Sequence, residues 1–170
     1  YHQDNGLDAV LFETTNNFPF LKGDKIQVLA FAGTNVAQAG DLKADLALFF
    51  GNESNQSEAA IQLMKKIKSD STITNLYITG HSLGGYLSLR ATATAEKDKF
   101  GKFKQTYTFN APKVKSGWFW GVPKDDVRIS EELAKSGKIK NYYTDNDNII
   151  PGNLQPSNKI SIGRSAGAHS

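Results

Sequence analysis

Cysteine is absent from this chain of 170 residues, and histidine and methionine are rare, with three copies and one copy. Without thiols, the chain has no disulfides, no thiolate nucleophiles and no cysteine-ligated metal sites. The three histidines lie at scattered positions that match no metal-binding spacing, so we expect neither a metal nor a cofactor. What remains for chemistry is a set of hydroxyl, carboxylate and imidazole side chains.

Long hydrophobic runs are also absent. No stretch approaches the roughly 20 apolar residues that a membrane-spanning helix needs, so we expect a soluble domain. A chain of 170 residues with 39% hydrophobic residues is expected to form one globular domain with its own core. Because the sequence begins at Tyr1 rather than at a methionine, we expect a piece of a longer protein. The compartment stays open between secretion, the cell surface and the cytoplasm.

The charge balance is mildly basic, with a formal net charge of +3 and a pI near 9.0. The lysines are spread along the chain and mixed with acidic residues, as on solvated helix faces. We therefore expect no nucleic-acid partner, while contact with a membrane surface stays open. The oligomeric state cannot be read from these patterns.

Strand-like and helix-like segments alternate along the chain. In the helix-like segment 57–68, Ser57 is a candidate N-cap, and Ile61, Met64 and Ile67 recur at helical spacing. Such alternation predicts an α/β fold in which helices cover a mostly parallel sheet. The predicted strands cover 25–32, 75–79, 105–110 and 138–144, with strand character again at 159–162, and the predicted helices cover 40–50, 57–68, 86–97 and 130–135.

The most informative motif is G-x-S-x-G, formed by Gly80, Ser82 and Gly84 with His81 and Leu83 between them. It follows a short β-type run and precedes a helix-type run, which is the context of a nucleophile elbow. Such a sharp turn places the serine hydroxyl at its tip and leaves room for little but glycine on either side. The sequence therefore predicts Ser82 as a nucleophile.

A serine nucleophile needs a base, and histidine is the usual one. His81 neighbours Ser82 at the tip of a turn, where adjacent side chains diverge, and His2 lies in a polar N-terminal stretch before the first predicted strand. His169, in a glycine- and serine-rich segment after the strand-like run 159–162, is therefore the predicted base. A terminal histidine without a catalytic partner is the alternative.

An acidic residue that orients the base should lie between the serine and the histidine, at the end of a strand. Asp145 and Asp147 both follow the aromatic run that ends the predicted strand 138–144. Either aspartate fits this role from its position alone. A calcium loop does not fit, because Ile149 and Ile150 stand where a polar ligand and then a glycine would be needed.

Five separated segments are informative together: FAGT at 31–34, DLKAD at 41–45, GHSLGG at 80–85, TFNAPKV at 108–114 and DNIIP at 147–151. These segments resemble the class 3, or fungal-type, lipase family of α/β-hydrolases. The resemblance implies an α/β-hydrolase fold in a short, bacterial-type relative, and it selects Asp147 as the acid of the triad. It also implies that Thr34 and Leu83 form the oxyanion hole, and that Asp45 supports Thr34.

The oxyanion assignments also agree with the general geometry of such sites. One N–H donor comes from the residue after the nucleophile, here Leu83, and another from the loop after an earlier strand, where Thr34 lies. A turn or helix cap is the alternative role for Thr34.

A glycine-bounded aromatic run follows the strand-like segment 105–110. Trp118, Phe119 and Trp120 cannot all face one core from a loop, so at least one is expected to contact an acyl chain, a partner or a membrane interface. A loop folded back as local core is the alternative.

These residues together predict a serine hydrolase that acts on small-molecule or lipid carboxylic esters through a Ser82–Asp147–His169 triad and an acyl-enzyme. The triad itself does not choose the leaving group, so a thioesterase or peptidase is one alternative. A non-catalytic binding module that keeps the elbow as architecture is another.

Overall fold

A six-stranded sheet forms the centre of the computed structural model, which describes residues 1–2, 6–14, 25–33, 54–115, 122–147, 150 and 152–164. The strands lie in the order in which they occur in the chain, so each new strand is added at the same edge of the sheet. They are β1 (Ala9–Glu13), β2 (Ile26–Phe31), β3 (Asn75–His81), β4 (Phe103–Phe109), β5 (Ile139–Tyr143) and β6 (Ile160–Ser161).

Five of these strands, β2 to β6, run parallel, and only β1 pairs antiparallel with its neighbour. The predicted α/β fold with a mostly parallel sheet is thus confirmed. The sequence analysis did not foresee β1, which lies in the N-terminal stretch before the first predicted strand. His2 lies beside this edge, where it bridges to Asp8 through its backbone and its ring.

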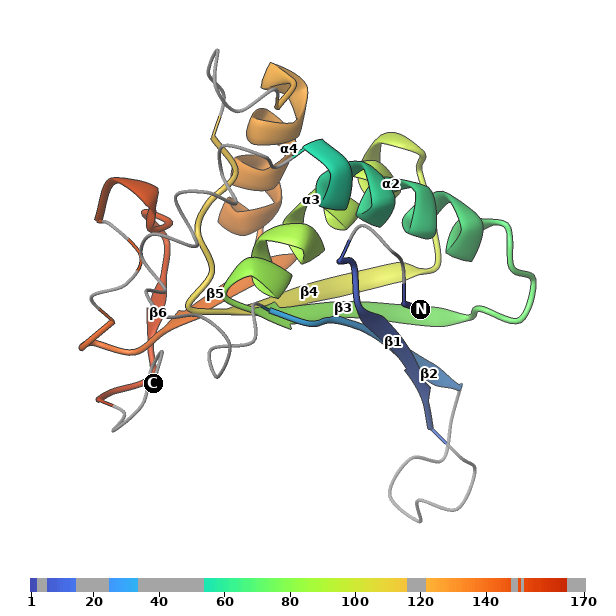
Figure 1. The fold of residues 1–170 in the computed structure, drawn as a ribbon, viewed down its shortest axis with the longest axis horizontal. Helices are drawn as coiled ribbons and strands as arrows, with labels where there is room; N and C mark the ends of the chain where they lie inside the picture. Colours follow the sequence, from blue (N-terminus) through green and yellow to red (C-terminus); the bar gives the residue numbers. More distant parts are fainter. Residues whose placement is uncertain are drawn as a thin grey trace.

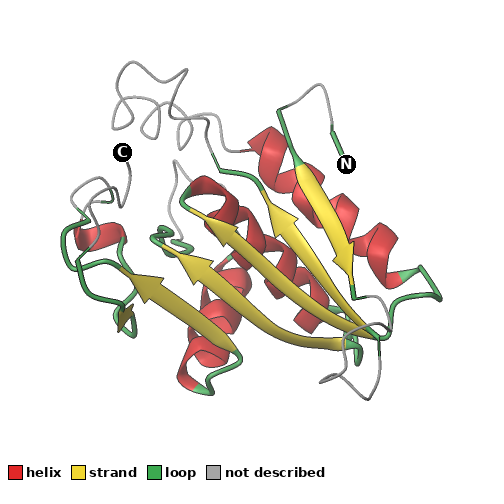
Figure 2. Cartoon of the chain, turned by 90° about the horizontal axis from the view of Figure 1, so that it is seen from below, coloured by secondary structure: helices red, strands yellow, loops and turns green. Residues whose placement is uncertain are grey.

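The three helices of the described part of the chain lie on one face of the sheet, as Figure 1 and the view from below in Figure 2 both show. The central helix α3 is buried at every residue from Leu83 to Ala95 because it lies between the sheet and its neighbours. None of the described helices is both long and apolar enough to cross a membrane. The helices are α2 (Ser54–Lys68), α3 (Leu83–Lys97) and α4 (Lys124–Lys135), with a short 3₁₀ turn η2 at Gly152–Leu154.

All three described helices begin before their predicted starts, and α3 begins at Leu83 instead of residue 86. Helix α2 begins at Ser54, so Ser57 lies inside the helix and is buried there instead of capping it. Helix α4 begins at Lys124, well before the predicted start at residue 130, and its first turn carries Asp125 and Asp126. The helix predicted over 40–50 lies outside the described residues.

A buried ion cluster fixes α4 against α3. The Asp126 side chain is 1% exposed and accepts hydrogen bonds from the Arg90 guanidinium and the Lys97 ammonium, each at 2.6 Å. A buried carboxylate is tolerated when cationic donors satisfy it in this way. The cluster therefore anchors α4 to the helix that follows Ser82.

Candidate active site

Ser82 occupies the turn between the last residue of β3, His81, and the first residue of α3, Leu83. Its backbone has φ 53° and ψ −122°, a conformation that side-chain-bearing residues rarely adopt. Two backbone hydrogen bonds hold this strained residue: its N–H donates to the Phe109 carbonyl at 2.9 Å, and its own carbonyl accepts from the Tyr86 N–H at 3.1 Å. The local geometry is that of the predicted elbow.

Three glycines allow the turn to close. A Cβ on Gly84 would lie 2.2 Å from the Phe31 carbonyl oxygen, and one on Gly80 would lie 2.3 Å from the backbone of Gly84. A Cβ on Gly85 would lie 2.4 Å from the Ala111 Cβ. Real Cβ atoms do not approach other atoms this closely, so each position requires glycine. Backbone packs directly on backbone at the elbow.

The Ser82 hydroxyl is buried, with the residue 4% exposed, and it has no hydrogen-bond partner among the described residues. A buried hydroxyl without a partner costs on the order of 1–3 kcal/mol, so a fold keeps one only where something offsets that cost. Strain and an unsatisfied hydroxyl thus coincide on one residue. Such coincidences are concentrated at functional sites.

The neighbouring backbone supplies N–H groups close to Ser82. Leu83 is the first residue of α3, and the first N–H groups of a helix have no acceptor within the helix. On the other side, a Cβ on Gly33 would lie 2.7 Å from the His81 carbonyl oxygen, so the chain leaving β2 passes directly beside the elbow. The segment that would continue to Thr34 therefore starts next to Ser82.

The acid candidates lie in the turn after β5. The Asp147 N–H donates to the Thr144 carbonyl at 3.2 Å, and the Asp147 Oδ1 accepts from the Ile150 N–H at 3.4 Å. Asp147 is half-buried, whereas Asp145 is exposed and accepts a 2.6 Å hydrogen bond from the Ser161 hydroxyl. The structure thus separates the two aspartates, with Asp147 directed inward and Asp145 tied to the outer strand β6.

Tyr143, the last residue of β5, carries a buried phenol whose surroundings include Asp147. Its ring is 1% exposed, and its hydroxyl donates to the Ala111 carbonyl. Burial, and secondly the negative charge of Asp147, raise the pKa of the Tyr143 phenol above its usual value. The phenol therefore stays neutral and serves as a donor.

The sheet brings the serine and the inward aspartate to one edge. Its register pairs His81 with Phe109 and Phe109 with Tyr142, so β3, β4 and β5 end at the same level. Ser82 and Asp147 follow the carboxyl ends of two strands that are separated only by β4. Ligands of parallel α/β sheets bind outside this edge.

Six predicted site residues lie outside the described residues. They are His169, the predicted base; Thr34 and Asp45, assigned to the oxyanion loop; and Trp118, Phe119 and Trp120 of the aromatic run. Of the predicted site, the structure therefore describes Ser82, Leu83 and Asp147.

Sequence reasoning gave no role to Asn110, the residue directly after β4. It has φ 43°, is 4% exposed, and hydrogen-bonds to Thr144 in the turn that carries Asp147. An asparagine just after a strand is a recognisable signal for the left-handed conformation, in which this residue type is enriched. Its partner 34 residues further along the chain has no such local signal.

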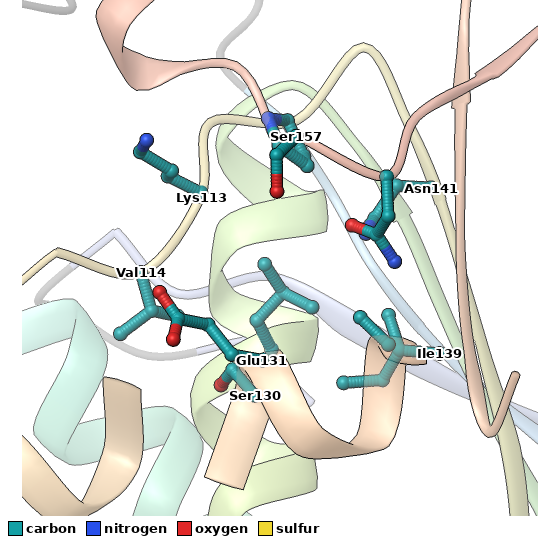
Figure 3. Close-up of a pocket in the computed structure, with 11 residues that line it drawn as sticks. Lys113, Val114, Ser130, Glu131, Ile139, Asn141 and Ser157 are labelled. Atoms are coloured by element: carbon teal, nitrogen blue, oxygen red, sulfur yellow. The ribbon is translucent and has the colours of Figure 1, made fainter. Parts of the chain in front are cut away.

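A separate small pocket lies between α3, α4 and β5 (Figure 3). Its volume of about 60 Å³ is well below that of a cavity of roughly 150 Å³ that binds benzene. Its described lining includes neither Ser82 nor Asp147, so it is distinct from the candidate site. Polar groups of Lys113, Ser130, Glu131, Asn141 and Ser157 line it together with Val114 and Ile139.

Comparison with known proteins gives one match. No curated protein and no solved structure matches this chain. A family model, that of the Tle-like phospholipase domain, matches residues 1–165. The match supports the resemblance to lipases at the level of a lipase or phospholipase family, and it agrees with the α/β architecture. Because the model covers nearly the whole chain, the chain belongs to the Tle-like phospholipase domain family.

Proposed function

We propose that this domain hydrolyses a carboxylic ester of a phospholipid, with Ser82 as the nucleophile. The observation that carries the proposal is the Ser82 hydroxyl itself: a strained, glycine-flanked residue with a buried oxygen that has no partner among the described residues. Membership of a phospholipase-like family supports a lipid ester as the substrate class.

In this mechanism, the Ser82 Oγ attacks the acyl carbonyl carbon while His169 accepts the hydroxyl proton. Asp147 orients the imidazole and stabilises its charged form. The resulting oxyanion is stabilised by backbone N–H groups of Leu83 and Thr34, as in the class 3 lipase pattern, and Asp45 supports Thr34.

Collapse of the tetrahedral intermediate breaks the bond to the leaving alcohol, which takes the proton from His169. A water molecule then attacks the acyl-Ser82 ester while His169 accepts a proton from the water. The bond from the acyl carbon to the Ser82 Oγ breaks, His169 returns the proton to that oxygen, and the fatty acid leaves. The aromatic run of Trp118, Phe119 and Trp120 would contact the acyl chain or the membrane interface, where such side chains are favourable.

The elbow also fits a thioesterase or peptidase that uses the same triad, and a binding module without chemistry. We favour ester hydrolysis because the family model is that of a phospholipase. The proposal treats residues 1–170 as one lipase-like α/β-hydrolase domain.

The test is fatty-acid release from mixed phosphatidylcholine and phosphatidylglycerol vesicles, together with a series of p-nitrophenyl esters of rising chain length. We expect Ser82→Ala to lose at least about 10³-fold in kcat. Ser130→Ala is the matched control, because Ser130 also has a buried hydroxyl without a partner among the described residues but lies inside α4 on unstrained helical backbone.

Full activity in Ser82→Ala would rule out the proposed nucleophile. A parent protein that hydrolyses thioesters or peptides but no oxygen ester would change the substrate class. Inactivity on all of these substrates, together with no covalent labelling by a fluorophosphonate probe, would favour the binding module.

A further inference from the structure

The end of β4 contacts both halves of the proposed site. On the side of the elbow, the Phe109 carbonyl accepts the Ser82 N–H at 2.9 Å. The Ala111 Cβ fills the space that a Cβ on Gly85 would need, at only 2.4 Å from that position. The backbone from Phe109 to Ala111 therefore packs directly against the turn that carries the nucleophile.

On the other side, the same segment is tied to the end of β5. The Asn110 Oδ1 accepts the Thr144 N–H at 2.9 Å, and the Asn110 Nδ2 donates to the Thr144 hydroxyl at 3.2 Å. The Asn110 N–H donates to the Tyr142 carbonyl at 2.8 Å, and the Tyr143 hydroxyl donates to the Ala111 carbonyl. Three successive residues of β5 and its turn are thus held by two residues after β4.

Asparagine suits this position for two reasons. Its φ of 43° is a left-handed conformation, which asparagine tolerates better than most residues. Its amide offers an acceptor and a donor from one short side chain, so it can bond both the backbone and the hydroxyl of Thr144. Glycine would keep the backbone conformation but lose both bonds.

Thr144 in turn holds the aspartate, because its carbonyl accepts the Asp147 N–H at 3.2 Å. A continuous series of contacts therefore joins Ser82 to Phe109, Asn110 to Thr144, and Thr144 to Asp147. We propose that Asn110 is a positioning residue that sets where Asp147 lies relative to Ser82. This inference rests on the proposed ester hydrolysis.

The variant that isolates this role is Asn110→Gly. Misplacement of a catalytic group by about 1 Å can cost on the order of 10²-fold in rate, so we expect kcat to fall by about 10- to 100-fold. KM should stay within about twofold, because the acyl-binding surface is unchanged. Thr144→Val should have a lower kcat than the parent, with a smaller loss than in Asn110→Gly. Thr144→Ser, which keeps the hydroxyl, should have a kcat close to that of the parent.

Lys99→Gly is the matched control. Lys99 has a similar left-handed φ of 51° and is exposed at the end of α3, away from the sheet edge that carries Ser82. Lys99→Gly therefore measures what a new glycine at a left-handed position does to stability, without a change near the candidate site. We expect parental kcat and KM in this variant.

A second measurement does not depend on catalysis: amide hydrogen exchange at Thr144 and Asp147 in the same folded proteins. We expect faster exchange at both amides in Asn110→Gly and parental exchange in Lys99→Gly. Parental exchange in Asn110→Gly would show that Asn110 does not hold the turn and would overturn the inference. Faster exchange with a parental kcat would reduce Asn110 to a purely structural contact and would overturn it equally.

Failure of the proposed function would give a different result, because the parent protein itself would then hydrolyse no ester. That result would remove the catalytic part of the inference, whatever the variants do. The exchange data then still decide whether Asn110 holds the Thr144–Asp147 turn.

Discussion

The two turns that carry the proposed nucleophile and acid are held by different interactions. At the elbow, Gly80 and Gly84 bring backbone against backbone, and a single added carbon would lie 2.2–2.3 Å from other atoms. At the turn of residues 144–147 that carries Asp147, which we call the acid turn, side chains make the contacts. The Asn110 amide and the Tyr143 hydroxyl are the donors or acceptors. The elbow depends on glycines that have no side chain, and the acid turn depends on polar side-chain groups.

This difference predicts opposite sensitivities. Added volume should damage the elbow through steric clash, whereas the acid turn should be damaged by the loss of one hydrogen-bonding group. Both turns are nevertheless joined through the end of β4, where Phe109 contacts Ser82. Variants of each kind therefore test whether the comparison holds.

The largest effect is expected from Asp147→Asn. The amide keeps the size of the side chain but loses the charge that stabilises the imidazolium, so kcat should fall by about 10³- to 10⁴-fold. The free energy of unfolding should change little. Initial rates on a p-nitrophenyl ester, together with urea unfolding, measure both quantities.

Asp145→Asn is the control for this change, because Asp145 is exposed and hydrogen-bonded to Ser161 on β6. It should keep parental kcat. The reverse outcome, a large loss in Asp145→Asn and none in Asp147→Asn, would assign the acid to Asp145.

The next effect is on stability at the elbow. Gly84→Ala places a Cβ 2.2 Å from the Phe31 carbonyl oxygen at the end of β2, a strand that is paired with β1 on one side and β3 on the other. We expect the free energy of unfolding to fall by about 3 kcal/mol or more. Gly101→Ala has no atom within 4 Å of the new carbon and should stay within about 0.5 kcal/mol of the parent. Equal stabilities in the two variants would contradict backbone packing at the elbow.

A smaller effect is expected from Tyr143→Phe on the side of the acid turn. The variant keeps the ring but removes the hydroxyl donor of the buried Ala111 carbonyl. Leaving that acceptor unsatisfied should cost about 1–2 kcal/mol in urea unfolding at pH 7. Tyr107→Phe is a suitable control, since among the described residues its hydroxyl donates to the Gln105 side chain, at a half-buried position.

Tyr143→Phe should also change how the stability of the fold depends on pH. Because the pKa of Tyr143 is raised in the folded protein, the unfolded chain loses this proton first as the pH rises past about 10. The folded state then binds more protons than the unfolded state, so stability falls with rising pH. Tyr143→Phe should show a shallower alkaline decline than the parent. An unchanged slope would mean that the phenol titrates normally.

The sheet could be predicted where local patterns are strong. Strands β2 and β3 combine β-branched or aromatic residues with alternating burial, so their periodicity and position agree with the expectation. The elbow could be predicted for the same reason, because its glycines and serine lie close together in the sequence. These features depend on the geometry of a few neighbouring residues.

Misses occurred where distant contacts decide the structure. The start of α4 contains Asp126, a charged residue that looks like a surface position but is buried against Arg90 from α3. Ser57 has the composition of a cap, yet α2 continues to Ser54 and buries it. Pairing across 36 residues, as between Arg90 and Asp126, has no signature in a local window.

The same reason separates the parts of the candidate site. Asp147 was chosen over Asp145 by family resemblance, because position alone left both open. The roles of Asn110 and Thr144 emerge only when β4 and β5 lie side by side, since these residues are 34 positions apart. The elbow at Ser82 was therefore predictable from its own neighbours in the sequence, and the contacts that support it were not.

The most direct test of the central claim is mass-spectrometric mapping of the protein after reaction with a fluorophosphonate probe. If Ser82 is the nucleophile, a single adduct should lie on the Ser82 hydroxyl, and Ser82→Ala should carry none under conditions in which Ser130→Ala is labelled like the parent. An adduct on another serine, or persistent labelling of Ser82→Ala, would contradict the claim that this elbow performs the chemistry.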